Sequence, residues 1–413
     1  MDAIYSPSER VPLQELQART ERLQVLMRDA GLDGLMATQN ADIYYLAGAL
    51  QQSQVYLPVE GEPIMMVRKH PGRAQADSSL GNGWGAVVTV RSLRELPDLI
   101  EKAGGRKPAM LGFELDTLPV LTFQAYQKAL APLGAQIVDA CFLFKRVRSI
   151  KSEYELEQIK RAATISEVIV QAAKRFIHEG ITEIELSARI EAEARIAGHS
   201  GLQRIRVYGQ EMHMGHVLAG ESGAVPSFMN SPQGGLGFGP WAPYGASRRP
   251  IRKGEPVLLD FAAEWAGYIS DQTRTLSIGK LPPFWVDAYE ATRAVQQHLE
   301  RKVRPGITSG QLYDMAVEQA GQLGYADNFM GPTESASPGQ RVPFVGHAVG
   351  LELDEWPPLQ RGTDVVLEAG MTLAIEPKMI FKGKGAIGVE DTYLLTKDGL
   401  QPLTFSTREI IET

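Results

Sequence analysis

Residues 257–275, VLLDFAAEWAGYISDQTRT, place two acidic residues inside an otherwise apolar pattern. The run VLL at 257–259 is typical of a buried strand, and it continues directly into Asp260. A second acid, Asp271, follows a Trp-Ala-Gly turn. An unpaired carboxylate buried in a sheet costs on the order of several kcal/mol. The stretch therefore predicts a partner that offsets the cost of burying both acids.

The same stretch predicts a strand-turn-strand hairpin. A turn centred between Trp265 and Ala266 would place Asp260 opposite Asp271. Facing side chains of an antiparallel pair have Cβ atoms about 4.5–5.5 Å apart. Two carboxylates at that separation repel each other unless cations bridge them.

Residues 371–396, MTLAIEPKMIFKGKGAIGVEDTYLLT, repeat this arrangement. A turn centred on Gly383 would place Glu376 opposite Glu390, each in an otherwise apolar strand. The alternative for all four acids is a solvent-facing position or pairing with Arg or Lys. Arg274 is close in sequence, but its odd offset from Asp271 directs it to the other face of the sheet.

His347, in PFVGHAVGLELDEWPPL (343–359), lies between small residues in an apolar stretch. A single histidine in such a stretch is usually a core residue. Beside four carboxylates borne on strands, it becomes the expected nitrogen ligand of a metal centre. Carboxylates with one imidazole suit two divalent ions, Mn²⁺ in particular or else Co²⁺ or Zn²⁺, about 3.5–4 Å apart.

The composition limits the other classes of function. A chain of 413 residues with 44% apolar and 22% charged residues predicts a soluble protein of two domains. Its net charge of −7 argues against a nucleic-acid or anionic-membrane partner. A single cysteine, Cys141, the polar segment 1–14 and the absence of a long apolar run predict a cytoplasmic location.

The order of elements predicts two domains that meet at residue 150. Residues 1–150 show an α/β alternation: helices at 15–31 and 95–106, and strands at 34–38, 43–48, 55–59, 63–67 and 109–114. Residues 151–413 begin with amphipathic helical stretches ending near 180 and 198, with Thr182 as the N-cap of the second. Strands follow, then helices at 283–302 and 309–323, then strands again. The Gly/Pro-rich segment 231–250 is interpreted as a flap, because it lacks the Gly-Lys-Ser/Thr ending of a phosphate-binding loop.

The five candidate ligands and the segments around them resemble the pita-bread metallopeptidases. Asp260, Asp271, His347, Glu376 and Glu390 match the order and spacing of that family's ligands, and the similar segments are GYISDQTRT, GHAVGLE, IEP and GVEDTYLLT. The start of the second domain, KSEYELEQIKRAA, and the first 150 residues resemble the branch containing aminopeptidase P, prolidase and the metal-free relative creatinase. The resemblance covers nearly the whole chain.

This resemblance implies a fold and a mechanism. The second domain would be an α+β domain with a curved, pseudo-two-fold antiparallel sheet that carries two metals on its concave face. A hydroxide that bridges the metals would attack an amide carbonyl, and Glu376 would accept and return the proton. Thr273 lies on the same face as Asp271 and would donate to the ligands. The resemblance also implies a homodimer.

Three positions depart from the family pattern. Asp354 stands where a second histidine usually contacts the substrate, Ser227 where another histidine is expected, and Gly388 where an arginine is usual. An aspartate cannot donate to an oxyanion unless it is protonated. Asp354 would instead repel a substrate carboxylate, or it would simply cap the local chain. His213 and His216, in EMHMGH, could supply the missing donors, and at least one is expected to face the site.

Three functions remain open from the sequence. The first is a dinuclear metallohydrolase that cleaves Xaa-Pro dipeptides or short peptides, with Glu376, Asp354 and His216 as candidate catalytic residues. The second is a hydrolase or lyase of small-molecule amides on the same scaffold, which the lost histidines favour. The third is a non-catalytic binding relative. The intact ligand set disfavours the third, and also metal-free chemistry of the creatinase kind, since a binding module need not keep five costly buried groups.

Overall fold

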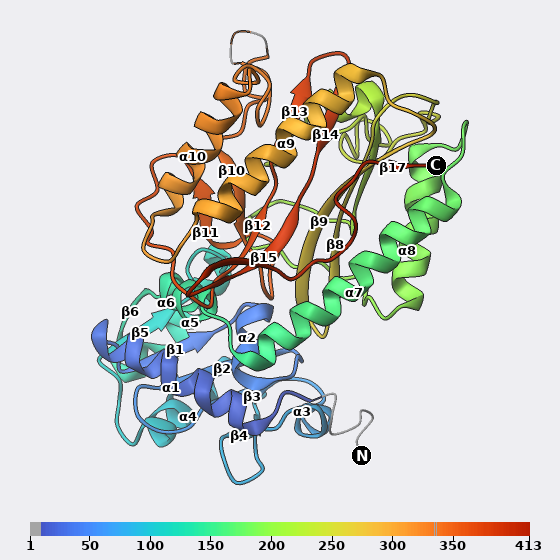
Figure 1. The fold of residues 1–413 in the computed structure, drawn as a ribbon. Coiled ribbons are helices and arrows are strands. Elements are labelled where there is room, and N and C mark those ends of the chain that lie inside the picture. Colours follow the sequence, from blue (N-terminus) through green and yellow to red (C-terminus); the bar gives the residue numbers. More distant parts are fainter. Residues whose placement is uncertain (1–9, 334, 336) are drawn as a thin grey trace. The chain divides into compact units, whose positions relative to one another are not determined.

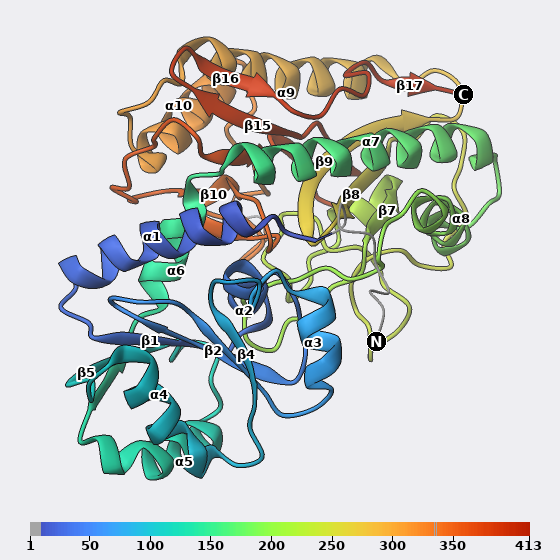
Figure 2. The same ribbon diagram turned by 90° about the horizontal axis from the view of Figure 1, so that it is seen from below.

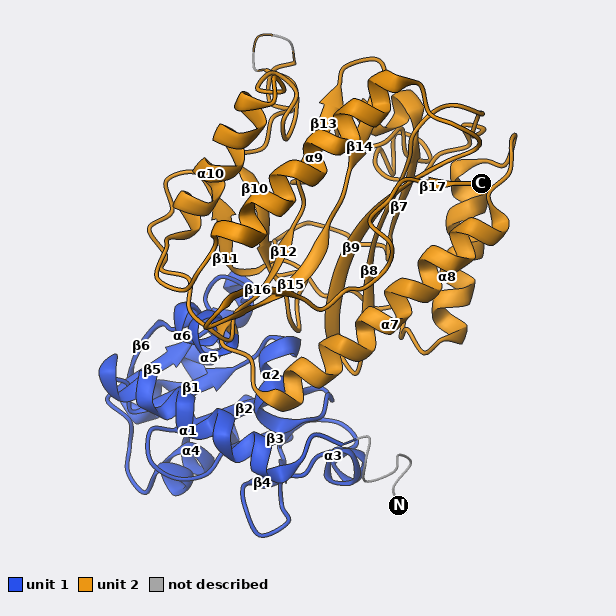
Figure 3. Cartoon of the chain, viewed as in Figure 1, with its two compact units in different colours: residues 1–148 blue, residues 149–413 orange. Residues whose placement is uncertain are grey.

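The computed structural model describes residues 10–333, 335 and 337–413, and it divides into two compact units (Figure 3). Unit 1 comprises Met1–Arg148, and unit 2 comprises Ser149–Thr413. Residues 1–9, which make up most of the polar N-terminal segment noted above, lie outside the described residues. No helix in the described part of the chain is both long and apolar enough to cross a membrane.

Unit 1 is built on one mixed sheet with the strand order β4-β3-β2-β1-β5-β6. β1 pairs antiparallel with β2 and parallel with β5. The elements of unit 1, labelled in Figure 1, are α1 (Leu13–Asp29), β1 (Gly34–Ala37), α2 (Asn40–Ala47), β2 (Ser53–Pro58), β3 (Ile64–Val67), α3 (Pro71–Asp77), β4 (Ala86–Thr89), α4 (Leu96–Gly104), β5 (Met110–Phe113), α5 (Val120–Leu130), β6 (Gln136–Asp139) and α6 (Cys141–Ser149).

The strand predicted at 43–48 is wrong, because these residues belong to helix α2 and its C-cap. The side chain of Gln39 accepts hydrogen bonds from the backbone N–H groups of Ala41 and Asp42, which fixes the start of the helix. Gly48 ends it with a φ of 67°. The aromatic and β-branched residues of IYYLAG favoured a strand, but the two caps and burial in unit 1 favour the helix.

Unit 2 begins with α7 (Glu153–Phe176) and α8 (Glu183–Ile196). Ser152 caps α7 in a capping box with Glu155. Thr182 caps α8 by accepting from the N–H of Glu185, which confirms the predicted N-cap. The remaining elements are β7 (Gly215–Ala219), β8 (Val257–Trp265), β9 (Tyr268–Ser277), α9 (Pro283–Lys302), α10 (Ser309–Gln322), β10 (Phe344–Ala348), β11 (Glu355–Gln360), β12 (Thr372–Ile375), β13 (Lys378–Phe381), β14 (Gly385–Gly388), β15 (Asp391–Thr396), β16 (Gly399–Pro402) and β17 (Ile411–Glu412).

The strands of unit 2 form two larger sheets and one hairpin. The sheets have the orders β17-β9-β8-β7 and β11-β10-β12-β15-β16, and β13-β14 is the hairpin. All these pairs are antiparallel except β17 with β9. Helix α7 packs on β8 and β9, and α10 packs on β11. Figure 2 shows α7 running beside β9, and α9 beside β16.

The two larger sheets meet where β9 adjoins β15. The hydroxyl of Thr392 accepts from the backbone N–H of Asp271 and donates to its carbonyl oxygen, at 2.8 and 2.9 Å. The N–H of Glu390 donates to the carbonyl oxygen of Thr273 at 3.1 Å. This junction brings residues near 271 and near 390 together, although more than a hundred positions separate them.

The predicted facing pair Asp260–Asp271 is wrong in register. Asp260 lies opposite Thr273, and Asp271 lies opposite Ala262. The turn consists of Ala266 and Gly267, whose φ values are 51° and 86°, as in the two-residue type I′ turns that match strand twist. The turn centre therefore lies one residue later than predicted. Since side chains alternate with a period of two, Asp260 and Asp271 still share one face, now as diagonal neighbours.

The register predicted for the second hairpin is confirmed. Lys378 pairs with Gly388 in one ladder, and Ile375 pairs with Asp391 in the next, both symmetric about Gly383. Glu376 and Glu390 lie opposite each other in the interruption between these ladders. Gly383 has a φ of 70° at the third position of a four-residue turn, which the N–H of Lys384 closes by donating to the carbonyl oxygen of Phe381, and positive φ at that position favours glycine.

Candidate metal centre

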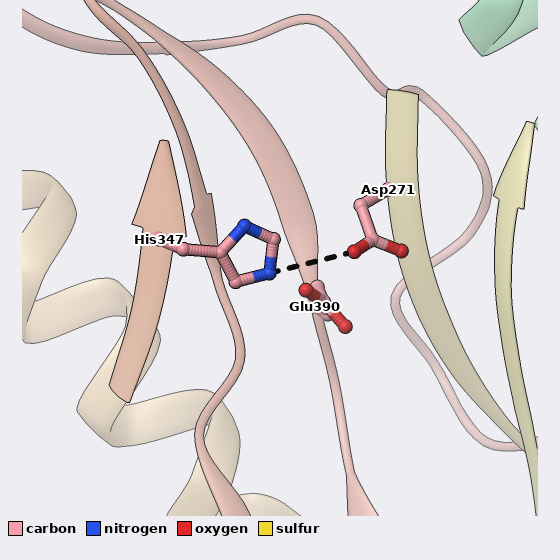
Figure 4. Close-up of side chains that lie close together, drawn as sticks. All are labelled: Asp271, His347 and Glu390. Atoms are coloured by element: carbon pink, nitrogen blue, oxygen red, sulfur yellow. Dashed lines mark ion pairs between the residues drawn. The ribbon is translucent and has the colours of Figure 1, made fainter. Parts of the chain in front are cut away.

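Three of the predicted ligands converge at the junction of the sheets. One ligand atom each from Asp271, His347 and Glu390 lies within 4.8 Å of the others, and all three side chains are buried or nearly so. In Figure 4 the three side chains point toward one another from β9, from β10 and from the segment before β15. Nε2 of His347 is 3.6 Å from Oδ2 of Asp271.

Local backbone features aim these side chains. The pairing of β10 with β11 shifts register on both sides of His347, which is a bulge of the kind that re-aims a side chain. On its other edge His347 pairs with Ala374 of β12, so it shares a face with Glu376 two residues later. The N–H of Glu376 donates to the carbonyl oxygen of Val345 at 3.0 Å and fixes that position.

A residue that the sequence reasoning missed, Lys378, lies among the other predicted ligands. Its Nζ is 2.6 Å from Oε2 of Glu376, 2.9 Å from Oδ2 of Asp260 and 3.4 Å from Oε2 of Glu390. The side chain is 1% exposed. The three donors of the ammonium group therefore meet three carboxylates away from water. Pairing of the acids with a lysine, the alternative weighed from the sequence, holds for three of the four.

Gly388 makes room for this lysine. It is the direct cross-strand partner of Lys378, and a Cβ built on it would lie 2.6 Å from Cγ of Lys378. An arginine here, the residue usual in the resembled family, could not coexist with the stem of Lys378 in this position. The signal was present in the sequence, because Glu376, Lys378, Gly388 and Glu390 share one face by the period of two.

Further hydrogen bonds hold the acids in place. The hydroxyl of Thr273 donates to Oε2 of Glu390 at 2.7 Å, which confirms the role predicted for it. Nε2 of Gln233, in the Gly/Pro-rich segment, donates to Oδ2 of Asp260 at 2.6 Å. Oε1 of Glu390 is buried and has no hydrogen-bond partner among the described residues. Glu390 also converges with Asp271 and His347, and such a group with an unsatisfied oxygen is a donor set that a cation would complete.

Burial and neighbouring charges shift the pKa values of three of the acids in different directions. Burial, reinforced by the Asp260 carboxylate, raises the pKa of Asp271 to about 7. Burial, with Asp271 as the next cause, raises the pKa of Glu390 well above its usual range. Burial alone would lower the pKa of Lys378, but the surrounding carboxylates raise it well above normal, so its ammonium keeps its charge. Burial opposes ionisation of Asp260 too, yet the ammonium of Lys378 leaves its pKa below the usual value. The ammonium of Lys378 thus pairs with Asp260, Glu376 and one oxygen of Glu390, while Asp271 lies beside the imidazole of His347.

Asp354 lies at the edge of the cluster. Its Oδ1 is 3.6 Å from Nε2 of His347, the same atom that Asp271 approaches, and its side chain is 34% exposed. Burial alone would lower the pKa of His347, but Asp354 and Asp271 raise it. The structure therefore places the residue that departs from the family pattern beside the candidate ligands.

The other candidate residues divide between the site and its surroundings. His216 pairs across the strands with Asp260, and burial lowers its pKa to about 4. Its buried Nδ1 has no hydrogen-bond partner among the residues that the structure describes. It is therefore a neutral imidazole beside the cluster. His213 instead stacks on Tyr244 and binds the carbonyl oxygen of Gly215 through Nδ1. Ser227 accepts from the N–H of Met229, within its own loop.

Comparison with known proteins identifies the family. The sequence profile of metallopeptidase family M24 matches residues 157–397, and that of the creatinase/prolidase N-terminal domain matches residues 19–150. The chain belongs to metallopeptidase family M24. It is accordingly a hydrolase, with an α/β N-terminal domain followed by the pita-bread catalytic fold, and membership implies a divalent metal ion.

Individual relatives align with this chain over nearly its whole length. The chain is 26% identical over 397 residues to an Xaa-Pro dipeptidase from Pyrococcus horikoshii, covering 96% of this chain and 99% of the relative. The solved structure of the prolidase from that organism matches with a TM-score of 0.76 and 25% identity over 95% of this chain and all of that one. An Xaa-Pro dipeptidase structure from Bacillus anthracis matches with a TM-score of 0.80 at 24% identity over 96% of this chain and all of that one.

The residues present fit a divalent ion at one place and conflict with it at another. Asp271, His347 and Glu390 offer converging atoms, and Oε1 of Glu390 has no partner in the described part of the chain. The mixed oxygen and nitrogen set suits Mn²⁺, Co²⁺ or Zn²⁺. On the Asp260 side, by contrast, the carboxylate oxygens already surround the ammonium of Lys378.

Proposed function

We propose that this M24 family member hydrolyses the amide bond of Xaa-Pro dipeptides or short Xaa-Pro peptides with the help of a divalent metal ion. The convergence of Asp271, His347 and Glu390 carries the proposal, because it is a buried, partly unsatisfied ligand set on a peptidase scaffold. A relative named Xaa-Pro dipeptidase, aligned over 96% of this chain and 99% of its own length, supports the substrate class.

The ion held by Asp271, His347 and Glu390 would supply Lewis-acid polarisation of the scissile carbonyl. The presence of two ions, with Asp260 and Glu376 as additional ligands, remains a prediction, and Lys378 bears on it directly. Manganese as the native ion likewise rests on the hardness of the oxygen-rich set.

Glu376 is the proposed proton carrier. Lys378 holds its Oε2 at 2.6 Å, which orients the carboxylate and leaves Oε1 to take a proton and pass it to the leaving amine. His216, a neutral imidazole beside Asp260, is the proposed neighbouring hydrogen-bond donor or acceptor for the substrate.

Asp354 favours a second candidate, the hydrolysis of a small-molecule amide. Its carboxylate lies at the site and would repel the free carboxylate that every dipeptide carries. A substrate without an acidic group near the scissile bond, or with a positive charge there, would be preferred. The two candidates share the reaction and differ only in the substrate.

A turnover screen separates these possibilities. Mn²⁺-loaded protein is incubated with Xaa-Pro dipeptides, longer Xaa-Pro peptides and cyclic amides, and released amine is measured. Asp271→Ala, which removes one ligand, should lose both bound metal and turnover. Cleavage of cyclic amides alone would support the second candidate, and wild-type protein that binds no divalent ion would refute both.

Three further features belong to this proposal. Residues 151–413 would form the catalytic domain and residues 1–150 a separate N-terminal domain. The protein would act as a homodimer in the cytoplasm. Light scattering at micromolar concentration tests the dimer, and cell fractionation tests the location.

A further inference from the structure

The ammonium group of Lys378 lies among carboxylates that were predicted to surround a metal cation. Its Nζ is surrounded by Oδ2 of Asp260, Oε2 of Glu376 and Oε2 of Glu390, at 2.9, 2.6 and 3.4 Å. These are acids that the sequence analysis predicted to be ligands of two metal ions. An ammonium group has three donors, so these contacts use all of them.

The position of the ammonium is built into the hairpin. Lys378 is the first residue of β13 and lies opposite Gly388 of β14, and the missing side chain at 388 gives its stem the space to pass. The side chain is 1% exposed, so the charge has no route to water without rearrangement of the hairpin. The lysine is therefore a fixed component of the site.

A divalent ion on the same oxygen atoms would conflict with this lysine. Metal–oxygen bonds in such sites are about 2.0–2.2 Å long, so an ion bound to the oxygens that now contact Nζ would lie within a few ångströms of the ammonium. Two like charges so close in a buried site repel strongly. Toward Asp271 and His347 there is no such obstacle, since a carboxylate oxygen of Glu390 converges with both, and Oε1 of Glu390 has no hydrogen-bond partner among the described residues.

We propose that the ammonium of Lys378 replaces one of the two divalent cations, so that the site binds a single ion between Asp271, His347 and Glu390. This inference rests on the proposed function only because it concerns the same site, and it does not depend on the substrate. Lys378 would then be a built-in counter-ion that keeps Asp260 ionised and orients Glu376. Gly388 is the compensating change that allows it.

The test is metal stoichiometry, which does not depend on finding a substrate. Metal-free protein is titrated with Mn²⁺ alone, bound ions per chain are counted by calorimetry and elemental analysis, and Mn²⁺ electron paramagnetic resonance reports whether two ions are coupled. The wild type should bind one uncoupled ion per chain. Lys378→Ala frees the carboxylates and should bind two coupled ions, whereas Lys384→Ala, an exposed lysine of the same hairpin, should bind one.

Two coupled ions in the wild type would overturn the inference, and so would no bound ion or an unchanged count in folded Lys378→Ala protein. If Lys378→Ala does not fold, as judged by circular dichroism, the wild-type spectrum alone decides between one isolated ion and a coupled pair. A wild type that binds one ion but cleaves no Xaa-Pro peptide would refute the proposed substrate and leave this inference standing.

Discussion

Arg274 offers a strong test of how the site is held together. Its side chain is fully buried, with Nη2 2.6 Å from Oδ1 of Asp391 and 3.0 Å from the carbonyl oxygen of Ser406. Its Nη1 donates to the carbonyl oxygens of Thr273 and Glu390 at 2.8 and 2.6 Å. One guanidinium group thus joins β9 to the segment that carries a candidate ligand. We expect Arg274→Met, which keeps the volume and removes the donors, to destabilise unit 2.

The contacts set the size of the effect. Removing one partner of a buried ion pair typically costs about 3–5 kcal/mol, because the other charge stays buried. Asp391 keeps Arg408, Gln296 and Thr404 as partners, at 2.7, 3.0 and 2.7 Å, so its carboxylate is not abandoned. The expected loss is therefore at the lower end of that range, about 3 kcal/mol.

Urea unfolding followed by tryptophan fluorescence measures this loss. Four of the five tryptophans lie in unit 2, so the signal reports mainly on that unit. The matched control is Arg161→Met, which breaks an exposed pair with Glu157 on α7 and should cost less than about 1 kcal/mol. The reasoning from burial would be refuted if both variants lost the same free energy of unfolding while the dependence of that free energy on urea concentration stayed unchanged.

Three more outcomes are expected. Glu376→Gln should lower turnover by about 10²–10⁴ while leaving the urea midpoint nearly unchanged, since it removes the proton carrier and keeps an acceptor for Lys378; near-normal kcat would assign that role elsewhere. Asp354→His should shift the ratio of kcat/KM values toward a free dipeptide over its C-terminally amidated counterpart, and equal ratios in both proteins would make Asp354 structural. Burial lowers the pKa of His199 below its usual 6.5, and its Nδ1 accepts from the N–H of Gly201 at 2.8 Å, so the folded state holds it neutral. As the pH falls, the unfolded chain therefore binds the proton before the folded protein does, and the free energy of unfolding decreases below about pH 6.5. His199→Gln removes this titration, so its free energy of unfolding should depend less on pH between 7 and 5.

The pattern of the sequence established which residues share a face. Residues two apart in an extended strand must point the same way, and this held for Asp271 with Thr273, whose hydroxyl donates to Glu390. The symmetry of the second hairpin likewise held for Glu376 with Glu390. The same alternation predicted that Arg274 lies on the opposite face, where it binds Asp391. Alternation is a local property of the extended chain, so it can be read without knowing the fold. The family segments add the order of the ligands along the chain.

The tertiary structure decided what the alternation leaves open. The turn at Ala266-Gly267 shifted the first hairpin by one residue, because backbone twist rather than hydrophobic pattern selects the turn. The caps of α2 and its burial turned a strand-like sequence into a helix. Above all, the ammonium of Lys378 meets the carboxylate of Asp260 across 118 positions of sequence. Such a meeting depends on how the two hairpins pack, and no local pattern in either one contains it. The sequence therefore determined which side chains could form a cation site, and the packing decided that a lysine of the chain itself holds part of it.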